Sequence, residues 1–158
     1  MTKMISILAL LLIGLATFGQ ANPHDKSNMS KKIFYDFVNA INERNVDKIY
    51  SLMADDFKFI DAHGNEVSSK DKMKAGWTGY FQWFPDYKIE ITDIFSNGDT
   101  LAALGFASGT FKGIKTDKND NYWRLPAAWK VLVNNNKIKL WQVYADTKIP
   151  FDIINKNK

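Results

Sequence analysis

The order of the hydrophobic patterns constrains the fold most: three helical patterns come first and strand patterns follow. Apolar residues recur at helical spacing from Lys31 to Ile41, and Ser30 is placed to cap that helix. Asn45 can cap a second, short helix that ends at Asp55-Asp56. A third helix, which begins near a capping-box pattern at Ser68 to Asp71, stops at Phe84-Pro85.

The remainder of the chain is typical of strands. A short strand over 57–61 lies between the second and third helices, and Asn97-Gly98 is a strong hairpin signal between two later strands. Gly76 and Gly79 are costly inside a helix, which indicates close approach of another element. We therefore expect one α+β domain with about three N-terminal helices packed on one face of a curved antiparallel sheet. Its later strands are expected at 87–95, 101–111, 122–133 and 137–146.

The first 21 residues have the pattern of a secretory signal. Lys3 supplies a positive start, an apolar run follows, and Gly19-Gln20-Ala21 fits a cleavage site after Ala21. We expect residues 1–21 to be a signal peptide, 22–29 a flexible leader and 30–158 the domain, with a secreted or periplasmic location. No stable membrane anchor is expected after cleavage, although an uncleaved anchor is the alternative.

Composition narrows the classes of function. The net charge of +4 is scattered, so no basic stripe points to nucleic acid. The chain has no Cys and only two His, His24 and His63, which leaves no His-rich or thiolate metal site. Its five Trp, six Tyr and 11 Phe are an unusual aromatic content, which fits either a lined cavity or an aromatic interface.

Asp61 and His63 are the candidate catalytic residues. A carboxylate at the mouth of an aromatic pocket would have its pKa raised by desolvation, which suits a general base, and His63 could assist it. The alternative for Asp61 is a turn residue that closes the strand before Gly64, and for His63 a loop residue without function.

Candidate ligand-binding residues come from the third helix and the later strands. In each case the alternative is plain core packing or, for Asp146, a turn. Gln142 lies among apolar residues and would need a partner if it were buried. The candidates are Trp77, Tyr80, Trp123, Trp129, Gln142, Tyr144 and Asp146.

Three segments together resemble the nuclear transport factor 2-like superfamily in its SnoaL-like branch. They are FVNAINERNVDKIYSLMADDFKFIDAHG, WFPDYKIEITDIF and KIKLWQVYAD, and the resemblance spans Ser30 to Asp146. It implies a cone in which a bent sheet and helices enclose a pocket. Members include ketosteroid isomerases, polyketide cyclases, epoxide hydrolases and dehydratases. The resemblance also implies a homodimer through the outer sheet face, for which we expect Trp141 and Val143 at the interface.

The catalytic residues of these relatives are only partly matched. Asp61-Ala62-His63-Gly64 resembles the isomerase segment that carries the carboxylate base. Phe37 stands where those enzymes have a tyrosine, and Trp129 lies near the position of their second acid, so the resemblance does not imply steroid isomerisation. Asp146 is the strand-end acid that could serve as in the cyclases.

Two classes of function remain open from the sequence. The first is an enzyme that acts on a small, largely apolar substrate with Asp61 as base, and such chemistry needs no cofactor. The second is a non-catalytic protein that binds an apolar ligand, or a dimeric scaffold whose cone is filled by aromatic side chains.

Overall fold

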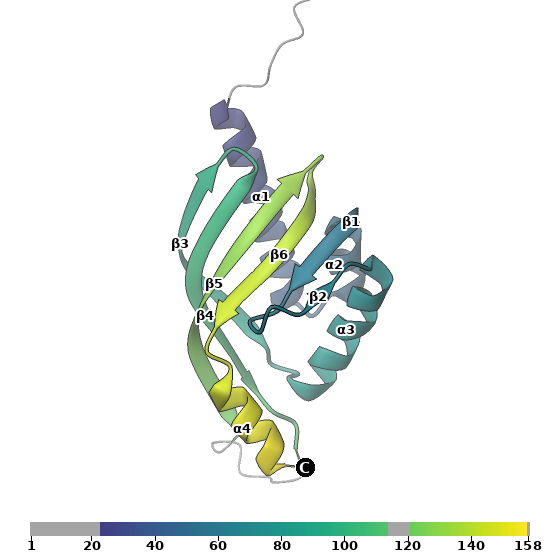
Figure 1. The fold of residues 1–158 in the computed structure, drawn as a ribbon, viewed down its shortest axis with the longest axis vertical. Coiled ribbons are helices and arrows are strands. Elements are labelled where there is room, and N and C mark those ends of the chain that lie inside the picture. Colours follow the sequence, from purple (N-terminus) through teal and green to yellow (C-terminus); the bar gives the residue numbers. More distant parts are fainter. Residues whose placement is uncertain (1–22, 114–120, 158) are drawn as a thin grey trace, which may run out of the picture.

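The computed structural model describes residues 23–113 and 121–157 and places helices against one side of a curved sheet (Figure 1). The predicted signal peptide therefore lies outside the described residues. The six described strands form one sheet in the order β2-β1-β6-β5-β4-β3. The elements are α1 (Pro23–Asn42), α2 (Val46–Leu52), β1 (Met53–Ile60), β2 (Glu66–Val67), α3 (Lys70–Trp83), β3 (Lys88–Asn97), β4 (Thr100–Thr110), β5 (Tyr122–Asn134), β6 (Lys137–Ala145) and α4 (Lys148–Lys156).

The cone-shaped α+β fold expected from the sequence is confirmed, with one correction to the sheet. Strands β3 to β6 form an antiparallel meander, and β1 pairs antiparallel with β2. The pair β1–β6 is parallel, so the sheet is mixed. The reason is topological: β1 precedes the meander, and the last strand of the meander returns beside it in the same direction.

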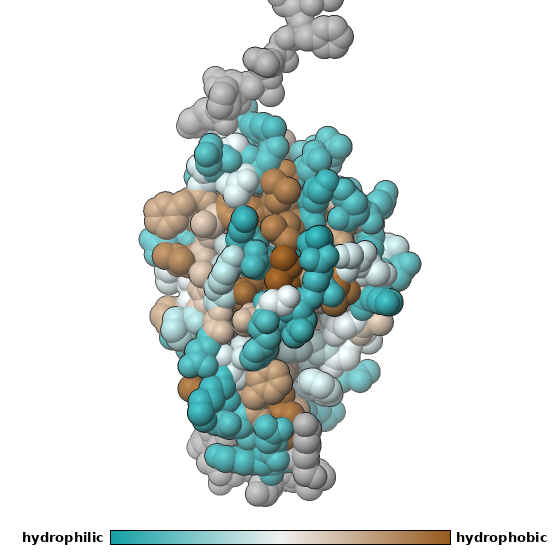
Figure 2. All heavy atoms as spheres, in the orientation of Figure 1, coloured by the Kyte–Doolittle hydropathy of each residue, from teal (hydrophilic) through white to brown (hydrophobic). Residues whose placement is uncertain are grey.

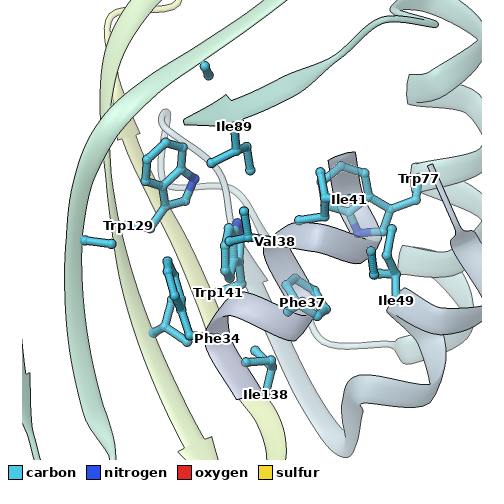
Figure 3. Packing of buried hydrophobic residues seen from close by; sticks show 14 of the residues in the cluster. Phe34, Phe37, Val38, Ile41, Ile49, Trp77, Ile89, Trp129, Ile138 and Trp141 are labelled. Atoms are coloured by element: carbon cyan, nitrogen blue, oxygen red, sulfur yellow. The ribbon is translucent and has the colours of Figure 1, made fainter. Parts of the chain in front are cut away.

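The centre of the core is Trp141 on β6, which is 1% exposed. Its ring lies 5.0 Å from that of Phe37 and 5.8 Å from that of Phe34, both on α1. Trp129 on β5 lies 6.3 Å away on the other side (Figure 3). Four large rings thus hold α1 on the inner face of the sheet, where packed aromatic pairs stabilise beyond their buried area.

The expected outward placement of Trp141 is wrong, and Val143 also faces inward, where it lines a cavity with Trp141. The cause is an irregularity in β6. Leu132 pairs with Leu140, but Val133 pairs with Ile138, so Lys139 is an extra residue on β6. An extra residue reverses the inward and outward alternation. Ile138 and Trp141 therefore both point inward, whereas simple alternation puts them on opposite faces.

Helix α1 begins earlier than expected. Residues 23–29, which we predicted to be a flexible leader, are its first two turns, and Pro23 suits the first helical position. Lys26 forms a 2.6 Å ion pair with Asp99, and Ser27 is hydrogen bonded to Ser96, so these turns are held by the β3–β4 hairpin. Ser30 is consequently a buried residue within α1 rather than its cap.

The predicted Asn45 cap is confirmed, and the cap of α3 lies one residue later than the Ser68–Asp71 capping-box pattern implies. The backbone N–H of Lys48 donates to Asn45 Oδ1 at 3.0 Å, and that of Lys72 donates to Ser69 Oγ at 3.2 Å. Helix α2 ends at Leu52 rather than at Asp55-Asp56, because Met53 already begins β1.

Helix α4 was not expected from the sequence. It follows β6 at the narrow end of the molecule (Figure 1) and buries Pro150 and Ile153. Asn157, just beyond α4, donates a side-chain hydrogen bond to Asn121 at 3.1 Å. Within 23–113 and 121–157, every helix is too short or too polar to cross a bilayer.

The close approach expected at the α3 glycines is not found. A Cβ at Gly79 would meet no atom within 4 Å, and one at Gly76 would meet only the Met73 methyl group at 3.8 Å. The close approach occurs on β4 instead: a Cβ at Gly105 would lie 1.9 Å from the backbone oxygen of Glu90.

These two environments predict opposite effects of the same substitution. Gly79→Ala should raise the free energy of unfolding by roughly 0.5–1 kcal/mol, because alanine favours a helix. Gly105→Ala should lower it by about 2 kcal/mol or more, because the β3 backbone must move. Urea denaturation of both variants measures the difference. A Gly105→Ala variant as stable as the wild type would contradict the strand packing.

Candidate functional site

A cavity of about 460 Å³ lies between α3 and the inner face of the sheet. It is far larger than a single water requires, and its walls are mainly apolar. The lining residues come from β1, β2, α3, β6 and the adjoining turns. They are Phe59, Asp61, Ala62, Val67, Lys72, Met73, Gly76, Trp77, Tyr80, Tyr87, Trp141, Val143 and Thr147.

Aromatic rings form one wall of the cavity. The rings of Trp77 and Tyr80 are 6.0 Å apart at 88°, and those of Tyr80 and Tyr87 are 4.9 Å apart at 87°. Phe81 stacks on Trp77 at 5.3 Å. Edge-to-face contacts of this kind fix ring orientation, so the wall is preorganised.

Two tyrosine hydroxyls bring polarity to this wall. Burial raises the pKa of Tyr87, and burial with the nearby Tyr87 raises the pKa of Tyr80, so both remain neutral phenols. Across 23–113 and 121–157, neither hydroxyl makes a hydrogen bond within the protein. Each can therefore donate to a bound molecule or to water.

Asp61 closes a tight turn beside the cavity. Its Oδ1 accepts hydrogen bonds from the backbone N–H groups of His63 and Asn65, both at 2.8 Å. Its Oδ2 accepts a third from the Asn65 side chain at 2.8 Å. Gly64 completes the turn with a φ of +86°, a conformation that favours glycine. This geometry fits the alternative given by the sequence, in which Asp61 is a turn residue that closes the strand before Gly64.

Two opposing effects act on the pKa of Asp61. Burial raises this pKa, but the hydrogen bonds from Asn65 and His63 together lower it below the usual value of 3.8. The expectation of a pKa raised toward a general base is therefore wrong, because hydrogen bonds to the ionised form outweigh desolvation. At neutral pH Asp61 is a carboxylate anion.

His63 lies in the same turn, but its side chain faces α4. Its Nε2 is 2.9 Å from Thr147 Oγ1, and its ring lies 5.4 Å from that of Phe151 in an edge-on contact. It lines a separate pocket of about 330 Å³ with Asp146 and α4 residues. Thr147 and Ala62 line both this pocket and the main cavity.

The structure brings three of the candidates together at the cavity: Asp61, Trp77 and Tyr80. Trp129 packs against Trp141 in the core, and Trp123 lies 5.5 Å from Phe84 and 6.1 Å from Tyr87. Neither is among the lining residues.

Three further candidates also lie away from the main cavity. Gln142 pairs with the exposed Lys130 on the outer face of the sheet, and Tyr144 is half exposed there. Asp146 accepts a hydrogen bond from the backbone N–H of Lys148 at 2.9 Å, as a turn residue does.

Sequence reasoning missed several lining residues. Tyr87 was seen only as part of a strand pattern, and Trp141 and Val143 were placed on the opposite face. Thr147 gave no signal, because its position depends on the α4 turn. The described residues contain no group of three or more His, Asp or Glu that could hold a metal ion.

This chain matches the model of a known protein family. The model of the SnoaL-like domain matches residues 34–141, about two thirds of the chain. No curated protein matches the chain.

Solved structures share the fold at low sequence identity. An LEH-like epoxide hydrolase from M. tuberculosis is 12% identical, with a TM-score of 0.68 over 84% of this chain and 93% of that one. A protein from Jannaschia sp., provisionally named a SnoaL-like polyketide cyclase, is 13% identical, with a TM-score of 0.69 over 84% of this chain and 98% of that one. A protein from Catenulispora acidiphila with a ketosteroid isomerase-like fold, solved with trimethylamine, is 19% identical, with a TM-score of 0.63 over 72% of this chain and 84% of that one. At these identities the likeness shows the fold alone.

The lowered pKa of Asp61 predicts a specific pH dependence of stability. Because the folded pKa lies below the unfolded one, the contribution of Asp61 is complete above about pH 4 and is lost as pH falls through the folded pKa. Asp61→Asn, which keeps the turn acceptor, should therefore lose less stability between about pH 4 and about pH 2 than the wild type. Urea denaturation at each pH, with NMR titration of the Asp61 carboxyl carbon, measures this. Equal acid sensitivity of the wild type and Asp61→Asn, together with an unshifted midpoint of the Asp61 carboxyl titration, would contradict the assigned hydrogen bonds.

Proposed function

Because this chain belongs to the SnoaL-like domain family, we propose that it binds a small, largely apolar organic molecule in the cavity beside α3. The observation that carries the proposal is the cavity itself, which measures about 460 Å³ and is lined largely by aromatic and apolar side chains, with few polar groups. Sites for small organic ligands have this size and this composition.

The neighbouring structures support the proposal at the level of ligand size. Their names include an epoxide hydrolase and a polyketide cyclase, and one was solved with trimethylamine, all of which imply small organic molecules. In this chain, Tyr80 and Tyr87 would orient a polar atom of the ligand, since their hydroxyls lack partners within the described protein.

Acid/base catalysis by Asp61 is the second candidate function. Its favouring observation is that Asp61 lines the cavity, and enolate formation would need no cofactor. A base must accept a proton, however, and three hydrogen bonds to Asp61 oppose that step by stabilising the anion. His63 faces α4 instead of the cavity, so it would not assist. The geometry therefore favours binding over catalysis.

We also propose that the domain is exported, on the basis of the signal-like residues 1–21. It would then meet its ligand in the periplasm or outside the cell.

We propose a homodimer through the outer sheet face, with interface residues other than the expected Trp141 and Val143. Leu104, Ala128 and Tyr144 lie in one row across β4, β5 and β6, and Leu104 and Tyr144 are 44% and 50% exposed. Figure 2, in the view of Figure 1, shows apolar side chains gathered in the middle of the surface between hydrophilic ones.

The dimer proposal predicts a mass of two chains in solution. Leu104→Arg should shift the protein toward monomer at equal concentration, because it places a charge in an apolar interface. Ile149→Arg, at a comparably exposed position on α4, should leave the mass unchanged. Sedimentation equilibrium measures both. A wild-type monomer at all concentrations would refute the dimer.

The binding proposal predicts that filling the cavity abolishes binding. Gly76 lines the cavity and Gly79 does not, although both lie on α3. Gly76→Phe should therefore remove saturable binding of tert-butylbenzene, whereas Gly79→Phe should retain it. Quenching of tryptophan fluorescence by the probe, with calorimetry, measures binding. Equal affinity of both variants, or no binding to the wild type, would contradict the proposed site.

A further inference from the structure

The cavity joins aromatic rings to a fixed negative charge. Five aromatic side chains line it: Phe59, Trp77, Tyr80, Tyr87 and Trp141. Asp61 is its acidic lining residue, and Lys72 is its basic one. An apolar ligand makes use of the rings, but the carboxylate adds nothing to its binding. The combination therefore favours a more specific class of ligand than size alone indicates.

The ring geometry suits a positive charge. The face of an aromatic ring carries partial negative charge and attracts cations within roughly 6 Å of its centroid. The rings of Trp77 and Tyr87 both lie close to the ring of Tyr80, and the rings of Tyr80 and Tyr87 are nearly perpendicular to each other. The three rings therefore form a corner instead of a flat stack. Both tyrosines remain neutral phenols, since burial raises their pKa. Such a corner can surround a compact cation from several sides.

Asp61 offers charge but little hydrogen-bonding capacity. Three of the roughly four acceptor positions on its two oxygens are already taken by His63 and Asn65. A primary ammonium, with three N–H donors, would find about one acceptor position left on Asp61 and would need the Tyr80 and Tyr87 hydroxyls or water for its other donors. A methylated ammonium has few or no N–H donors and needs only the field of the carboxylate and the ring faces.

Lys72 opposes this preference only weakly. It is an exposed residue in the first turn of α3, where its ammonium can stay in water. Asp61, in contrast, is fixed by its turn. The two groups form no ion pair in the part of the chain that the structure describes.

From these observations we propose that the preferred ligand is an organic cation with a methylated ammonium group attached to an apolar body. The ammonium group lies between Asp61 and the rings of Trp77, Tyr80 and Tyr87. This inference rests on the proposed binding function and names the ligand class for the same cavity.

Two probes of the same shape separate charge from size. Phenyltrimethylammonium and tert-butylbenzene differ only in that a quaternary nitrogen replaces a quaternary carbon. Wild-type protein should bind the cation about tenfold more tightly, as expected for ring contacts and a nearby carboxylate. Calorimetric titration at low salt, with tryptophan quenching as a second readout, measures both dissociation constants.

Charge variants then assign the preference to residues. Asp61→Asn should reduce the ratio of the two dissociation constants to about threefold or less, because it removes the fixed negative charge beside the rings. Asp71→Asn is the matched control, because it removes a carboxylate from the same region outside the cavity and should keep the preference. Lys72→Gln should tighten binding of the cation alone, which tests the charge argument without altering the Asp61 turn.

Each outcome decides between the two proposals. If tert-butylbenzene binds as tightly as the cation or more tightly, the inference is overturned and the binding function stands. If neither probe binds, both fail. If Asp61→Asn and Lys72→Gln leave the preference unchanged, the assigned charge recognition is wrong.

Discussion

The packing of Trp141 between α1 and the sheet determines the remaining geometry. Its contacts with Phe34 and Phe37 hold α1 across the inner face, and Trp129 supports it from β5. The extra residue at Lys139 makes this possible, because it turns both Ile138 and Trp141 inward. Trp141 also borders the cavity. The same side chain therefore fills one part of the cone and forms a wall of the part that stays open.

The turn at Asp61 gives that cavity its electrostatic character. Within this fold a carboxylate at the end of the first strand can act as a base only if it accepts a proton readily. In this chain Asn65 and the His63 backbone use its acceptor positions and favour the anion. The hydrogen bonds that make Asp61 a poor base also make it a fixed negative charge beside neutral aromatic rings.

Sequence reasoning predicted what local patterns encode and missed what distant contacts decide. The Asn45 cap depends on a few neighbouring residues and was predicted correctly, and the cap of α3 was predicted to within one residue of Ser69. The inward direction of Trp141 depends on a bulge that pairing with β5 creates, so a strand apolar on both faces could not reveal it. Thr147 reaches the cavity only because α4 follows β6, and the expected pKa of Asp61 omitted the hydrogen bonds of its own turn.

The central claim is that the cavity beside α3 is the binding site, and the position of a bound probe tests it most directly. Intermolecular nuclear Overhauser effects from the methyl protons of bound phenyltrimethylammonium should reach the rings of Trp77, Tyr80 and Tyr87. Effects confined to Leu104 and Tyr144 on the outer sheet face would contradict the account.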